Sequence, residues 1–170
     1  MSFGDELTKA WSETHFDPSI LARIFNDARC LFFVGNGGSA AIASHMANDF
    51  AKNGGKHALA FNDASALTCL ANDFGYEKVF EFPLNQHLRG LDVLIAISSS
   101  GESENIILAA NVARRKAAAL VTFTGFSPHN RLRKLGKQNI YVPSSDYGVV
   151  ETMHLGMLHA VIREMPNARR

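Results

Sequence analysis

The stretch Leu31-Phe32-Phe33-Val34-Gly35-Asn36-Gly37-Gly38-Ser39 decides the fold of this 170-residue chain. Four apolar residues precede a glycine-rich turn, and the pattern that follows, as far as Asp49, is helical. Glycine permits a tight turn and a close approach to a ligand, while the first N–H groups of a helix point outward without partners. This order therefore predicts an anion site, with phosphate as its natural guest. A plain strand-to-helix connection is the alternative.

The rest of the chain repeats this alternation of strand and helix. Apolar runs of strand length lie at residues 31–34, 57–61, 93–97, 119–123 and 140–142. Helical periodicity occupies residues 40–52, 65–73, 77–88, 103–116 and 149–164, with one or two further helices at about 3–28. Alternation of this kind predicts a parallel sheet covered by helices on both faces. We therefore expect one α/β domain spanning residues 1–170.

Composition excludes several classes of protein. The chain is 46% hydrophobic, and its 17 basic and 16 acidic residues leave a formal charge of +1. Such a balance gives no overall field to attract nucleic acid or an anionic membrane. No signal-like segment and no run long enough to span a bilayer is present in the sequence. Cys30 and Cys69 match no metal or redox spacing, so we expect buried thiols and a cytoplasmic protein.

A second candidate anion loop, residues 98–103, follows the apolar run at 93–97. Its sequence is Ser-Ser-Ser-Gly-Glu-Ser, and a helical pattern begins immediately after it. Ligands of open parallel sheets bind beyond the carboxyl ends of the strands. Hydroxyls at a helix start, without lysine or arginine, suit a phosphomonoester. The phosphate-binding pattern of nucleoside triphosphatases is absent, so no nucleotide cofactor is expected. Alternatively, Ser103 is an ordinary helix cap and the other serines are turn residues.

An ordered set of motifs across most of the chain resembles the sugar isomerase (SIS) family, and within it the phosphoheptose isomerases. The motifs are Gly35–Ser39, His45 with Asp49, Ala71–Gly75, Ile97–Ser103, Leu120–Gly125, and Glu151 with His154 and His159. The resemblance implies a three-layer α-β-α sandwich with a five-stranded parallel, flavodoxin-like sheet. It also implies a homotetramer with active sites between subunits. Its implied activity interconverts sedoheptulose 7-phosphate and D-glycero-D-manno-heptose 7-phosphate through an enediol(ate), supplying heptose for lipopolysaccharide or capsule.

The resemblance assigns substrate contacts to particular positions. It implies that the sugar is met by Asn36, Gly37, Gly38, Asn72, Asp73 and Glu151, and the phosphate by Ser98, Ser99, Ser100 and Ser103. The serine loop agrees with the phosphate site expected from the residues themselves. By contrast, Asn72 and Asp73 before Phe74-Gly75 are equally typical of a helix end and turn.

The resemblance also implies the catalytic pair and a zinc site. Asp49 and His159 take the places of the catalytic carboxylate and imidazole, and the zinc ligands correspond to His45, Asp49, Glu151 and His159. His45 and Asp49, spaced i and i+4, share a helix face, although a solvated pair has the same spacing. His154 is expected on a different face, as a packing or supporting residue.

This chain departs from the phosphoheptose isomerase pattern at two of these positions. The family Glu is Asp49, whose carboxylate lies about 1.5 Å nearer the backbone. The family Gln is Glu151, which adds a negative charge that could strengthen a cation site or repel phosphate. Glu151 and His159 are eight residues apart, about 12 Å along a helix, so a metal shared by both is more easily reached between subunits.

A non-catalytic function is the alternative. Some relatives of phosphoheptose isomerases are tetrameric phosphosugar-binding proteins that associate with the bacterial replication initiator. That group lacks both the final histidine and the acid of the first helix after the glycine turn. This chain retains both, as His159 and Asp49, which favours an enzyme.

Overall fold

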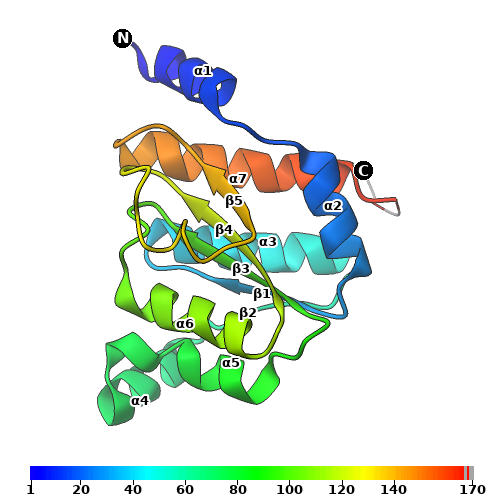
Figure 1. Cartoon of the computed structure of the whole chain (residues 1–170), viewed down its shortest axis with the longest axis vertical. Helices are drawn as coiled ribbons and strands as arrows, with labels where there is room; N and C mark the ends of the chain where they lie inside the picture. Colours follow the sequence, from blue (N-terminus) through cyan, green and yellow to red (C-terminus); the bar gives the residue numbers. More distant parts are fainter. Residues whose placement is uncertain (167, 169–170) are drawn as a thin grey trace.

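A five-stranded, entirely parallel sheet forms the centre of the computed structural model, which describes residues 1–166 and 168. The strands are β1 (Leu31–Val34), β2 (Ala58–Ala60), β3 (Val93–Ser98), β4 (Ala119–Thr124) and β5 (Gln138–Tyr141). Their order across the sheet is β2-β1-β3-β4-β5 (Figure 1). This is the flavodoxin-like arrangement, so the predicted fold class is confirmed.

Helices cover both faces of the sheet. They are α1 (Phe3–Glu13), α2 (Pro18–Asp27), α3 (Gly38–Lys52), α4 (Ala64–Phe74), α5 (Glu81–His87), α6 (Glu104–Arg115), α7 (Tyr147–Arg163) and the 3-10 helix η1 (Tyr76–Lys78). In Figure 1, α2, α3 and α7 lie on one side of the sheet and α5 and α6 on the other, while α1 packs on α7. The three layers are those expected of an α-β-α sandwich.

Two sequence expectations were wrong in this layer of helices. The continuous helix predicted at residues 77–88 is broken into η1 and α5. Continued through Pro83, it would lack that residue's N–H and drive the proline ring into the carbonyl of Val79. Cys69 is exposed rather than buried, because α4 packs at the outer edge of the layer and buries none of its residues. Cys30 is buried as expected.

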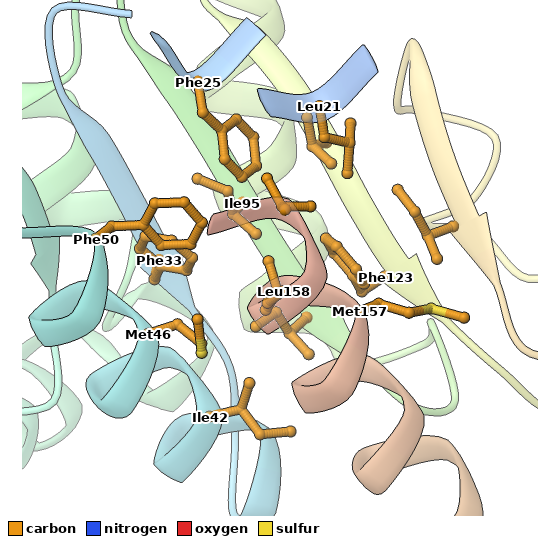
Figure 2. Packing of buried hydrophobic residues seen from close by; sticks show 14 of the residues in the cluster. Leu21, Phe25, Phe33, Ile42, Met46, Phe50, Ile95, Phe123, Met157 and Leu158 are labelled. Carbon is orange, nitrogen blue, oxygen red and sulfur yellow. The ribbon is translucent and has the colours of Figure 1, made fainter. Parts of the chain in front are cut away.

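Side-chain alternation along the strands divides the core into two clusters. Phe33, Ile95 and Phe123 point toward α2, α3 and α7 (Figure 2), whereas Phe32 and Leu94 pack on the opposite face with α5 and α6. β1, β3 and β4 each contribute to both clusters because successive side chains point to opposite faces. Both α3 and α7 are thereby held rigidly against the same face. In the described part of the chain, no helix has the length and apolarity needed to cross a bilayer.

The sheet topology brings the two candidate anion loops together. β1 and β3 are paired neighbours, although β2 lies between them in the sequence. The loops that leave their carboxyl ends therefore diverge to opposite faces and open a crevice between them. Gly35–Ser39 forms one wall of this crevice and Ser98–Ser103 the other.

Candidate functional site

A pocket of about 240 Å³ lies at this crevice. Its lining consists of Asn36, Gly37, Gly38, Ser39, Ser98, Ser99, Ser100, Ser103, Tyr147 and Glu151. Every substrate contact expected from the sequence is among these residues, with the exception of Asn72 and Asp73. Within the described ranges, no lysine or arginine belongs to the lining. The pocket therefore offers hydroxyls and backbone groups to an anion, rather than side-chain cations.

The serine loop has two hydroxyls that bond within the loop and two that do not. Ser98 Oγ accepts from Gly101 N at 3.2 Å, and Ser100 Oγ accepts from Glu102 N at 3.2 Å. Ser103 is the N-cap residue of α6, yet its side chain makes no capping bond. Ser99 Oγ is buried and has no hydrogen-bond partner in the described part of the chain. The turn interpretation accounts for Ser98 and Ser100, but not for Ser99 and Ser103.

Gly38 and Glu151 occupy the opposite side of the pocket in close contact. Gly38 is the first residue of α3, and a Cβ built there would overlap the carboxylate of Glu151 from α7. A side chain at residue 38 would therefore displace the Glu151 carboxylate where α7 reaches the N-terminus of α3. The N-terminus of α3 is the positive end of the helix dipole and favours an anion. Glu151 supplies a carboxylate at that place.

Asn36 is fixed by a network that the sequence did not indicate. Its amide forms a reciprocal pair with the amide of Asn105 on α6, with both N–O distances 2.9 Å. The hydroxyl of Tyr76 also donates to Asn36 Oδ1, at 2.9 Å. Asn105 is 3% exposed, and its only sequence signal is a polar residue beside buried isoleucines. Tyr147, at the start of α7, was likewise missed as a pocket residue.

Asn72 and Asp73 lie away from this pocket. Both are exposed near the end of α4, where Asn72 Nδ2 donates to Asp73 Oδ1 at 2.9 Å. In the single chain they have the local geometry of a helix end, as the alternative interpretation described. Tyr76, which follows Gly75 at that helix end, connects the segment to Asn36.

His45, Asp49 and His159 form a separate cluster between α3 and α7. Asp49 Oδ2 lies 3.5 Å from His45 Nε2 and 3.7 Å from His159 Nδ1. The two imidazole rings are 5.3 Å apart between centroids. One ligand atom from each residue can be chosen so that all three lie within 4.8 Å of one another. Two imidazoles and a carboxylate with this spacing form a possible metal-binding triad, and they also supply groups for proton transfer.

This cluster faces a second hollow. Asp49 and His159 line a cavity of about 770 Å³, together with Asn53, Ile162, Arg163, Glu164 and Ala168. Glu151 is not part of the cluster, since it lies at the serine pocket. Eleven residues of α3 separate Gly38 from Asp49, which corresponds to about 16 Å along the helix axis. The pocket and the cluster are therefore two distinct places on one chain.

His154 is fully buried on the inner face of α7. Its Nε2 lies 3.2 Å from the carbonyl oxygen of Thr124, and its ring packs edge-on against Phe123. Burial lowers the pKa of His154 to about 4, because an imidazolium would lose its hydration. It is a neutral packing residue, as expected from its place five residues before His159.

Comparisons with known proteins agree with this arrangement. The model of the SIS domain matches residues 18–125. A phosphoheptose isomerase of Akkermansia muciniphila is 35% identical over 163 residues, covering 90% of this chain and 86% of the relative.

Solved structures show the same likeness. The phosphoheptose isomerase of Neisseria gonorrhoeae superposes with a TM-score of 0.85 at 29% identity, covering 92% of each chain. That of Francisella tularensis, at 21% identity, has the same fold with a TM-score of 0.81 over 94% of this chain and 90% of its own. The non-catalytic alternative is not favoured by these matches. The chain belongs to the SIS family and, within it, to the phosphoheptose isomerases.

Proposed function

We propose that this protein is an aldose-ketose isomerase that interconverts sedoheptulose 7-phosphate and D-glycero-D-manno-heptose 7-phosphate. The observation that carries the proposal is the pairing of a cation-free serine pocket with a His-Asp-His cluster on the same fold. The pocket suits a phosphate monoester, and the cluster suits proton transfer next to a carbonyl. Heptose supply for surface polysaccharide, in the cytoplasm, is the setting we propose.

The serine pocket holds the phosphate in this proposal. The hydroxyls of Ser98, Ser99, Ser100 and Ser103 surround its oxygens. The N-terminus of α6 offsets part of the phosphate charge. Asn36, Gly37 and Gly38 border the carbon chain, and Glu151 accepts hydrogen bonds from sugar hydroxyls.

Asp49 and His159 carry the proton transfers. In the direction from ketose to aldose, the Asp49 carboxylate removes a proton from C1, and the C–H electron pair forms the C1–C2 double bond of the enediolate. His159 gives a proton to the oxygen on C2 and takes one from the oxygen on C1. Return of a proton to C2 completes the aldose, so that no atom or electron is gained or lost.

Zinc fits the donor set of the cluster. Imidazole nitrogens and carboxylate oxygens are ligands that zinc prefers, and those of His45, Asp49 and His159 are close enough to share one ion. Zinc bound there would polarise the oxygens on C1 and C2 of the sugar. Glu151 would join these ligands only from a second subunit, because in its own chain it lies at the serine pocket.

The substrate's length argues that the pocket and the cluster of each active site come from different copies of the chain. In an extended heptose phosphate, bonds of about 1.5 Å place C2 roughly 9 Å from phosphorus. About 16 Å of α3 separates the pocket from Asp49 within one chain. A homo-oligomer, most simply the tetramer expected from the sequence, brings the pocket of one subunit to the cluster of another.

A turnover assay tests the proposed function. Purified, metal-analysed protein is incubated with sedoheptulose 7-phosphate, with and without added zinc, and aldose formation is followed. Asp49→Asn and His159→Ala should each lower kcat by about 10²-fold or more while retaining the fold. Absence of turnover by the unaltered protein under both conditions contradicts the heptose assignment, and full turnover by His159→Ala removes that residue from the mechanism.

Subunit mixing tests the shared site. Ser99→Ala/Ser103→Ala protein should be nearly inactive for lack of the pocket, and His159→Ala for lack of the cluster. If each site joins two copies, mixed oligomers formed by co-expression regain up to a quarter of the activity, about the share expected for random pairing. A mixture no more active than its parents contradicts the shared site.

A further inference from the structure

We infer that Asn105 is a positioning residue, which holds the amide of Asn36 so that one Asn36 N–H remains for the sugar. The basis is the closed amide pair between the β1–α3 turn and the first turn of α6. The inference deepens the proposed function, since the ligand in question is its phosphosugar.

The hydrogen bonds define what Asn36 can offer a ligand. Its Oδ1 accepts from both Asn105 Nδ2 and Tyr76 Oη, so both lone pairs of that oxygen are used. Its Nδ2 donates one hydrogen to Asn105 Oδ1 and keeps the second. Because Asn36 also lines the pocket, it presents a donor to the substrate and no side-chain acceptor.

Burial makes Asn105 the fixed member of the pair. Asn105 is 3% exposed, whereas Asn36 is half-buried at the pocket wall. A buried amide is costly unless its hydrogen bonds are made, and here the Asn36 amide makes them. The pairing therefore restricts the rotation of Asn36 before a ligand arrives, which reduces the entropy that binding must oppose.

The pair also connects the two walls of the pocket. Asn36 belongs to the glycine turn, while Asn105 follows the serine loop by two residues. Tyr76 brings in a third segment, the one that follows α4. Substitution of Asn105 should therefore leave the Asn36 amide free to rotate while the serine hydroxyls stay in place. The binding of the sugar part of the ligand should weaken, and the binding of its phosphate should not.

A double-mutant cycle on ligand binding tests the inference. Dissociation constants for sedoheptulose 7-phosphate and for inorganic phosphate are measured by calorimetry on Asn36→Ala, Asn105→Ala and the double variant. Asn105→Ala should weaken sugar phosphate binding about tenfold, the value of one hydrogen bond to a polar ligand, and change phosphate binding less than twofold. In the Asn36→Ala background, Asn105→Ala should add less than twofold.

Further variants guard against a purely structural effect. Tyr76→Phe, at an exposed phenol, removes one bond to Asn36 Oδ1 and should weaken sugar phosphate binding two- to fivefold without unfolding the protein. Asn111→Ala, on the same helix, is the matched control and should have no effect. Thermal unfolding of every variant checks the fold.

The outcomes separate this inference from the proposed function. The positioning role is overturned if Asn105→Ala weakens sugar phosphate binding equally in the unaltered protein and in Asn36→Ala. It is also overturned if Asn105→Ala weakens the binding of inorganic phosphate as much as that of the sugar phosphate, even if turnover is normal. Binding of the sugar phosphate without turnover contradicts the isomerase assignment alone, because the cycle is read from dissociation constants.

Discussion

Removal of the Ser99 hydroxyl should stabilise the protein and weaken its hold on phosphate. Ser99 is 5% exposed, and its Oγ has no partner among the described residues. A buried, unpaired polar group costs about 1–3 kcal/mol. Ser99→Ala should therefore raise Tm by about 2–12 °C, since 1 kcal/mol corresponds to about 2–4 °C at this chain length.

Ligand binding should change in the opposite sense. A hydrogen bond to a charged group contributes about 1.5–3 kcal/mol, so Ser99→Ala should raise the Kd for inorganic phosphate about tenfold or more. Thermal unfolding with increasing phosphate or sedoheptulose 7-phosphate measures both quantities in one titration, because a bound ligand raises Tm according to its affinity.

Thr124→Val is the matched control for this prediction. Thr124 Oγ1 is also buried and without a partner in the described part of the chain, but Thr124 does not line the pocket. Removal of this hydroxyl in Thr124→Val should stabilise the protein without affecting phosphate binding. A Ser99→Ala protein that is less stable than the unaltered one and binds phosphate equally well would refute the reasoning.

Three further predictions concern α3 and α7. Gly38→Ala should turn the Glu151 carboxylate aside at a cost of about 1 kcal/mol or less, since only the end of a flexible side chain has to move, and adding Glu151→Ala should recover most of that loss in urea unfolding. Glu151→Gln removes a negative charge from the pocket, so calorimetry should show that inorganic phosphate binds at least about fivefold more tightly at low salt. The gain in affinity should be smaller at high salt, and weaker binding by the variant would contradict this prediction. The His154 pKa is lowered from 6.5 to about 4, so the unfolded state binds the extra proton and stability should fall by about 3 kcal/mol as pH decreases through that window. His154→Gln should remove this part of the pH dependence, and an unchanged profile would show that His154 is not its source.

Patterns local in the sequence predicted most of the fold. The buried runs at β1, β3 and β4 are mostly apolar, as is typical of strands covered on both faces, and their predicted bounds differ from the observed ones by at most one residue. Between residues 77 and 88 the apolar residues recur with helical spacing on both sides of Pro83, so the sequence predicted one helix. The proline ring prevents a continuous helix there despite this spacing. Cys69 shows that apolar neighbours do not ensure burial when a helix packs at the edge of the layer.

The serine pocket was predictable for the same local reason, since each wall is a loop that directly follows a strand. The Asn36–Asn105 pair was not, because it joins residues 69 apart and nothing in the sequence around Asn105 connects it with the glycine turn. The separation of Glu151 from the His45–Asp49–His159 cluster was foreseen only as a length along α7. Its place against Gly38 depends on how α3 and α7 pack, which no single segment specifies.

Deuterium exchange into the sugar tests the central claim most directly. The protein is incubated with sedoheptulose 7-phosphate in D2O, and the carbon-bound protons are followed by NMR. An enediol(ate) formed through Asp49 predicts incorporation of solvent deuterium at C1 of the ketose and C2 of the aldose, and at least about 10²-fold slower incorporation with Asp49→Asn. Aldose that forms without solvent deuterium, or incorporation that is equally fast in Asp49→Asn, would contradict the account.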